Sequence, residues 1–130
     1  MSAFSLSFAV DDDGESTLIA SLDTGAFKGR CFYRCPPSEF ADLVTALKAY
    51  PVTRENPIDQ RWYDGCLVLR IEPINSVGRL SVRALLQDYS SEWHRCQSQF
   101  YASYGDLDSF REQLEAVVAR GAGDAVLSSS

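Results

Sequence analysis

The stretch FKGRCFYRCPPSEFADLVTALKAYP, residues 27–51, decides the fold because it joins one strand to one helix at a sharp boundary. Its first part alternates between two faces over residues 27–35, as a β-strand does. Pro36 and Pro37 end that strand, since proline cannot donate to a sheet ladder. Apolar residues then recur at helical spacing, at Phe40, Leu43, Val44 and Leu47. The stretch therefore predicts a strand that leads directly into an amphipathic helix.

The chain on either side of this stretch shows the same order of elements twice. Residues 4–50 have the pattern of three strands followed by a helix, and residues 66–120 repeat that order, with residues 51–65 as the connecting loop. We therefore expect a single α+β domain over residues 1–121. The pattern predicts an antiparallel sheet of about six strands with both helices packed on one face, and the halves are compatible with a duplicated βββα unit. Residues 122–130 are expected to form a flexible C-terminal tail.

Composition and charge limit the class of protein. The chain has 130 residues and a formal net charge of −6. This charge argues against nucleic-acid binding, because phosphate contacts need clustered Lys and Arg. No basic and apolar leader opens the sequence, and no apolar run reaches the roughly 20 residues of a membrane helix. We expect a cytoplasmic protein whose partner is neither a nucleic acid nor a membrane.

The four cysteines fit a reducing compartment. Cys31 and Cys35 lie four apart on a predicted strand, which separates their Cα atoms by roughly 13 Å, too far for a disulfide. Cys66 and Cys96 are isolated in the sequence, and no CxxC pair is present. The cysteines are therefore expected to be small buried thiols without a zinc ion.

No catalytic constellation stands out in the sequence. His94 is the only histidine, and we expect a structural or surface role for it. The segment from Asp11 to Glu15 lacks the alternating ligands of a calcium loop and is typical of a hairpin turn. A glycine-rich phosphate loop and a G-x-S-x-G elbow are both absent from the sequence. The sequence predicts a protein that is not an enzyme and has no catalytic residue, cofactor or metal ion.

Two groups of residues are candidates for binding a partner. The first is the acidic turn, which can speed the approach of a basic partner: Asp11, Asp12, Asp13 and Glu15. The second group contains the residue types that dominate interface hot spots: Trp62, Tyr63, Trp93 and Arg95. A structural alternative for the tryptophans is that Trp62 holds the loop on the core and Trp93 packs in the sheet.

The sheet face without helices is a third candidate for docking. Antiparallel sheets commonly leave one face in solvent. The alternation of the strands places mainly basic and amide side chains on this face: Lys28, Arg30, Arg34, Arg70, Arg83, Arg95, Gln97 and Gln99. If this face makes the contact, the partner need not be basic.

The order of motifs resembles that of the small bacterial immunity proteins of the WapI type, which are found beside polymorphic or contact-dependent toxins. The resemblance rests on residues 27–51, on CLVLRIEPINSVGRLSVRALL at 66–86, and on QSQFYASYGDLDSFREQLEAVV at 97–118. It covers nearly the whole chain through the order of elements, and it brings no functional residue with it. The resemblance implies a cytoplasmic, non-enzymatic protein that binds a cognate toxin domain and blocks it.

Three hypotheses for the function follow. The first is an immunity protein that neutralises its toxin by stoichiometric binding. The second is a small-ligand-binding protein or enzyme with a pocket between sheet and helices, lined by Trp62, Trp93 and Tyr101. The third is a structural module that self-associates, as a homodimer, through an exposed edge strand.

Overall fold

The elements of the chain follow an order that occurs twice. The computed structural model describes residues 2–48, 52–62, 65–74, 78–88 and 94–129. Within these residues the elements are β1 (Ala3–Val10), β2 (Ser16–Asp23), β3 (Lys28–Cys35), α1 (Pro37–Leu47), β4 (Ile58–Trp62), β5 (Leu67–Pro73), β6 (Arg79–Asp88), β7 (His94–Ser103), α2 (Tyr104–Arg120) and β8 (Ala122–Ser128). The predicted order of three strands and a helix is therefore present in both halves, and each half continues with one more strand.

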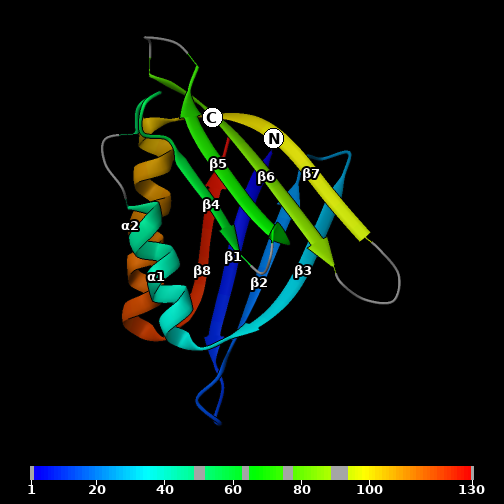
Figure 1. Cartoon of the computed structure of the whole chain (residues 1–130), viewed down its shortest axis with the longest axis vertical. Helices are drawn as coiled ribbons and strands as arrows, with labels where there is room; N and C mark the ends of the chain where they lie inside the picture. The colour runs from blue at the N-terminus through cyan, green and yellow to red at the C-terminus, as the bar shows by residue number, and fades with distance from the viewer. Residues whose placement is uncertain (1, 49–51, 63–64, 75–77, 89–93, 130) are drawn as a thin grey trace.

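The strands form two antiparallel sheets of four strands each, so the prediction of a single six-stranded sheet is wrong. Sheet A has the order β3-β2-β1-β8 and sheet B has the order β4-β5-β6-β7. The fourth strand of each sheet comes from the opposite half, because β8 pairs with β1 and β4 pairs with β5. The architecture is still α+β, as predicted, and it is one compact domain (Figure 1).

The prediction of a flexible tail is wrong for residues 122–128, which form β8. Gly121 ends α2 in the left-handed conformation, with φ of 75°, and this turn directs the chain back along the helix. Ala125 and Leu127 are then fully buried. Val126 between them is apolar as well, so the segment shows too little alternation to predict a strand.

Strand β4 lies within the segment that was expected to be a loop. Its alternation is brief, with Ile58 buried and its neighbour Asp59 exposed. The prolines and polar residues before it hid this pattern. Because β4 forms an edge of sheet B, it contributes residues to the outer surface of that sheet.

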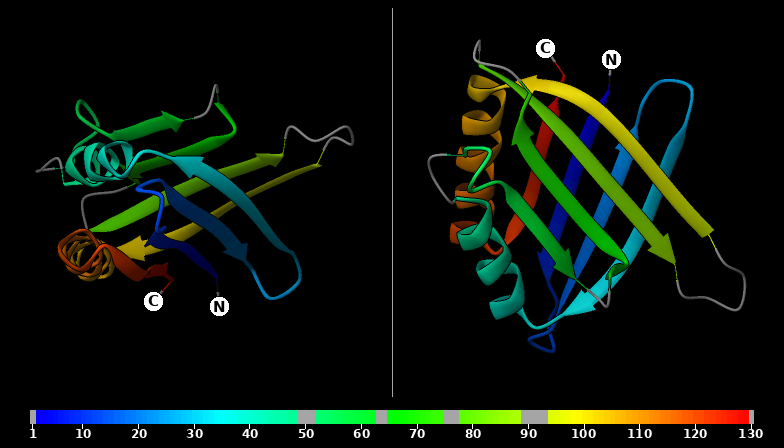
Figure 2. Two further views of the ribbon diagram at one scale, coloured as in Figure 1. Left: turned by 90° about the horizontal axis from the view of Figure 1, so that it is seen from below. Right: turned by 45° about the horizontal axis from the view of Figure 1, so that its top comes forward.

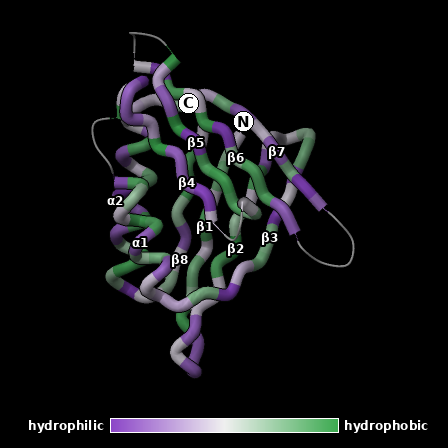
Figure 3. The backbone as a smooth tube through the Cα atoms, in the orientation of Figure 1, coloured by the Kyte–Doolittle hydropathy of each residue, from purple (hydrophilic) through white to green (hydrophobic). Residues whose placement is uncertain are grey.

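The two sheets pack face to face, and both helices close the side of the molecule where β4 and β8 lie (Figures 1 and 2). Apolar residues alternate with hydrophilic ones along the strands, as the hydropathy colouring shows (Figure 3). Two residues of β1 join the helices to the core. Phe8 stacks on Phe40 of α1 with ring centroids 4.0 Å apart, and Phe4 meets Phe110 of α2 edge-on at 6.2 Å. The helices thus pack on the inner side of sheet A.

The two sheets approach each other closely where β3 faces β7. A Cβ atom placed on Gly29 would lie 2.6 Å from Cβ of Cys96, a separation that real Cβ atoms essentially never show. Glycine at this position therefore lets β3 and β7 come together. This contact fixes the spacing of the two sheets at their strand edges.

Candidate functional site

The acidic turn is held by its neighbours on sheet A. Arg34 of β3 forms ion pairs with Asp11, at 2.9 Å, and with Asp13, at 3.4 Å. Asp13 also accepts a hydrogen bond from the backbone N–H of Glu15. The turn between β1 and β2 was predicted, and one arginine offsets part of its negative charge. Asp12 and Glu15 are exposed, as a contact residue would have to be.

The structure separates the second group of candidate residues. Trp62 is partly buried and packs against the hydrophobic core, but it does so at the end of strand β4 and not in a loop. Arg95 is exposed at the beginning of β7. Tyr63 and Trp93 lie outside the described residues. Tyr101 is 45% exposed, so it does not share a buried pocket with Trp62.

Arginines gather on the outer face of sheet B. The strands alternate strictly, so odd-numbered residues of β6 and β7 face away from sheet A. We define the arginine face by five residues on this side of the sheet: Arg61, Arg70, Arg79, Arg83 and Arg95. Three of them were predicted to share a face. The other two, Arg61 and Arg79, were not predicted on this face. Arg61 was missed because β4 was not predicted, and the signal that could have identified it is the short alternation of residues 58–62.

The predicted face is divided between the two sheets. Lys28, Arg30 and Arg34 belong to β3 and lie on the outer side of sheet A. The remaining predicted residues of that face belong to sheet B. Alternation within a strand shows which residues share a side, but it cannot show which sheet the strand joins.

Among the described residues of this outer face, two carboxylates, Asp59 and Glu72, accompany the five arginines. These seven residues carry a net charge of +3, although the whole chain carries −6. Arg70 binds both carboxylates, with nitrogen–oxygen distances of 2.7 Å to Asp59 and 3.0 Å to Glu72. These contacts, first that with Glu72, raise the pKa of Arg70 above its ordinary value. Arg70 is therefore held in a fixed position by its own sheet.

Arg83 and Arg95 have no hydrogen bond or ion pair in the part of the chain that the structure describes. Both side chains are exposed. An unpaired guanidinium is a ready partner for a carboxylate or a phosphate, because its donors match either group bidentately. These two residues give the arginine face its capacity to bind an anionic group.

A shallow depression of about 230 Å³ lies among four of these arginines, Arg61, Arg70, Arg83 and Arg95. Gln97 completes its edge, and Val68, Ala84 and Leu85 contribute to its lining. We call it the arginine-rimmed depression. Two of its arginines, Arg61 and Arg70, pair with Asp59, and the side chains of the other two, Arg83 and Arg95, are exposed. This arrangement suits recognition of an acidic surface.

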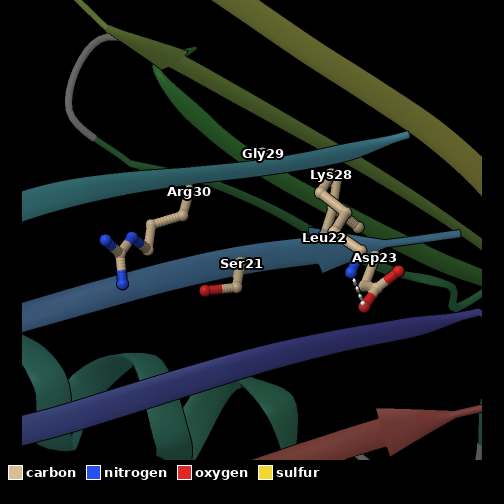
Figure 4. A pocket seen from close by; sticks show the side chains of 6 residues that line it. All are labelled: Ser21, Leu22, Asp23, Lys28, Gly29 and Arg30. Carbon is tan, nitrogen blue, oxygen red and sulfur yellow. Dashed lines mark ion pairs between the residues drawn. The ribbon is translucent and has the colours of Figure 1, made fainter. Parts of the chain in front are cut away.

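A second depression, of about 430 Å³, lies on sheet A where β2 ends and β3 begins. Figure 4 shows that Lys28 and Asp23 point toward each other there, and their charged atoms are 3.7 Å apart. Arg30 is its other cation and lies 5.3 Å from the ring centroid of Phe32. The larger depression thus offers less unpaired charge than the smaller one.

Thiols cluster between the sheets. Cys31, Cys66 and Cys96 lie near one another and near Tyr33, although they are distant in the sequence. The hydroxyl of Tyr33 donates to the carbonyl of Cys66 at 3.1 Å. Burial raises the pKa of Cys31, so this thiol stays protonated at neutral pH and is a weak nucleophile. The cluster is therefore better explained by packing than by catalysis.

The described residues offer little other chemistry. His94 is exposed on β7. Among the residues that the structure describes, no three His, Cys, Asp or Glu side chains gather closely enough to hold a metal ion. None of the helices in these residues has the length and apolar character needed to cross a membrane.

Comparison with known proteins adds no family to this picture. A scan against protein-family models finds no match to the chain. A search of curated proteins finds no significant match either. The arginine face is therefore interpreted from its own geometry.

Proposed function

We propose that this protein is a non-enzymatic binding protein that neutralises a bacterial toxin domain by stoichiometric binding. The resemblance to WapI-type immunity proteins motivates the toxin as partner. One observation supports the binding surface, namely the concentration of five arginines on the exposed side of sheet B in an acidic chain. Arginine is enriched at interface hot spots, and a broad sheet face suits contact with another protein.

The charge of this surface specifies the kind of toxin surface that it contacts. Arg83 and Arg95 are exposed and can pair with carboxylates of the partner. The contact is therefore with an acidic patch of the toxin, and blocking follows from occlusion. The acidic turn is less suited to be the main contact, because Arg34 already binds Asp11 and Asp13.

The test uses the purified full chain and the toxin domain encoded beside it. We expect light scattering to detect a 1:1 complex and toxin activity to disappear near the equimolar ratio. The variant Arg83→Glu/Arg95→Glu should weaken both effects strongly. Full toxin activity at a large excess of the wild-type chain would contradict the proposal.

The same light-scattering measurement tests the self-association alternative. Edge strand β3 carries Lys28, Arg30 and Arg34, and charged side chains on an edge strand oppose pairing with a second copy. We therefore expect the free chain to have the mass of one copy over a wide concentration range.

A further inference from the structure

The arginine-rimmed depression has an apolar floor. Val68 of β5 and Leu85 of β6 are register partners on the outer face of sheet B, and both are half-buried. Cross-strand partners on one face touch, so the two side chains form one continuous apolar surface. This floor leaves apolar area in contact with solvent, where a partner can cover it.

The charged rim surrounds this floor on several sides. Arg61 is the register partner of Val68 on β4, and Gln97 is the partner of Leu85 on β7. Arg70 and Arg83 are register partners two residues away along the strands, and therefore on the same face. Positive side chains from neighbouring strands thus enclose a small apolar centre.

The size of the depression limits what can enter it. Its volume of about 230 Å³ is below the about 300–1,000 Å³ of typical small-molecule sites. A single amino-acid side chain fits this space better than a cofactor does. Arg83 and Arg95 at its rim have no partner among the described residues and can bind groups that flank that side chain.

We infer that the arginine-rimmed depression binds an acidic segment of a protein partner, with one apolar side chain on Val68 and Leu85 and flanking carboxylates on Arg83 and Arg95. This inference rests on the proposed function and names the chemistry of the segment that the toxin presents. The apolar floor provides the preference for protein, because a nucleic-acid backbone would use the arginines and leave the floor uncovered. Arg70, held by Asp59 and Glu72, keeps the rim in place.

The experiment measures binding of short peptides to the isotope-labelled full chain by NMR. The probe is Ac-Asp-Glu-Leu-Glu-Asp-NH2, and the matched peptides replace its leucine by serine or its acids by lysine. We expect shifts of the Val68 and Leu85 methyl signals and of the Arg83 and Arg95 Nε–H signals. Affinity for the leucine peptide should be about tenfold higher than for the serine peptide, which corresponds to partial burial of one leucine side chain. The lysine peptide should not bind.

Two variants separate the floor from the rim. Leu85→Gln should remove the preference for leucine and retain weak binding of both acidic peptides. Arg83→Gln/Arg95→Gln should weaken both acidic peptides about equally. Equal affinity of the leucine and serine peptides for the wild-type chain would overturn the inference, as would tighter binding of an oligothymidine strand at the same face.

The peptide experiment and the toxin experiment can fail independently of each other. If the toxin is neutralised in an Arg83-dependent way and the peptides do not bind, the inference fails and the function stands. If the peptides bind as expected and no toxin complex forms, the function fails and the depression is established as a peptide site.

Discussion

The outer faces of the two sheets use their basic side chains differently. On sheet A, Arg34 binds Asp11 and Asp13 and Lys28 binds Asp23, so its cations serve mainly to hold neighbouring turns and strands. On sheet B, Arg83 and Arg95 have no such partner among the described residues. Both faces are basic in sequence, and among the described residues sheet B keeps more of its positive charge available than sheet A does. The difference shows that pairing of charges, more than their number, distinguishes a binding surface from a structural one.

Charge reversal on the outer face of sheet B gives the largest expected effect, and the same reversal on sheet A is its control. Arg83→Glu/Arg95→Glu should weaken toxin binding by about 100-fold or more, because interfacial charge pairs at a hot spot typically cost several kcal/mol when removed. Lys28→Glu/Arg30→Glu changes the net charge equally and should alter affinity by less than about threefold. Titration calorimetry measures both. Equal losses from the two variants would remove the distinction between the faces.

The contact between the sheets provides the next test. Gly29→Ala places a methyl group against Cys96 and should lower the free energy of unfolding by about 1–3 kcal/mol through overpacking. Urea denaturation measures this change. Gly105→Ala is the control, since its Cβ would meet only Ser103 at 3.6 Å and should stabilise α2 slightly. In a double-mutant cycle, Cys96→Gly should recover part of the loss; additive effects would disprove the steric explanation.

Removing the side chain that covers β8, an edge strand of sheet A, should have a smaller effect. The carboxamide of Gln113 accepts from the backbone N–H of Val126 at 2.9 Å and donates to its carbonyl at 3.5 Å, so α2 covers this strand edge. Gln113→Ala should lower stability by about 0.5–1.5 kcal/mol and speed hydrogen exchange of the Val126 amide. Glu112→Ala, on the exposed side of α2, should change neither. Unaltered exchange at Val126 would show that Gln113 does not protect the edge.

Neutralising the acidic turn should have the smallest effect. Asp11→Asn/Asp13→Asn removes two exposed ion pairs with Arg34 and should cost less than about 1 kcal/mol of stability. Association with the toxin should be unchanged or slightly faster in stopped-flow measurements, because the partner surface is acidic. A clear decrease in the association rate would instead support the acidic turn as a steering element for a basic toxin.

Local signals in the sequence predicted most of the elements. Alternation, or a run of apolar residues at 66–72, identified six strands, and helical spacing identified both helices. The capping box of Ser103 and Asp106, which begins α2, is a local signal that the sequence analysis did not use. Strands β4 and β8 escaped because their apolar alternation is short.

The division into two sheets could not be predicted, because it depends on pairing between distant segments. Strand β8 reaches β1 from the other end of the chain, with Leu127 beside Phe4. The same limit applies to the candidate site. Alternation placed Arg83 and Arg95 on one side of the sheet, yet only the strand order brings Arg61 to them.

Each half of the chain supplies the fourth strand of the other half's sheet, so the two halves are linked in the same way at both of their ends. The backbone N–H of Ser129 donates to the carbonyl of Ser2 at 2.8 Å, so the last strand returns to the first just as β4 leads into β5. The pair β8–β1 and the pair β4–β5 therefore occupy equivalent positions in the strand order. A circular permutant that joins the present ends and begins at β5 should keep the same pairing of strands. Each half alone, in contrast, would carry a strand whose partner lies in the other half.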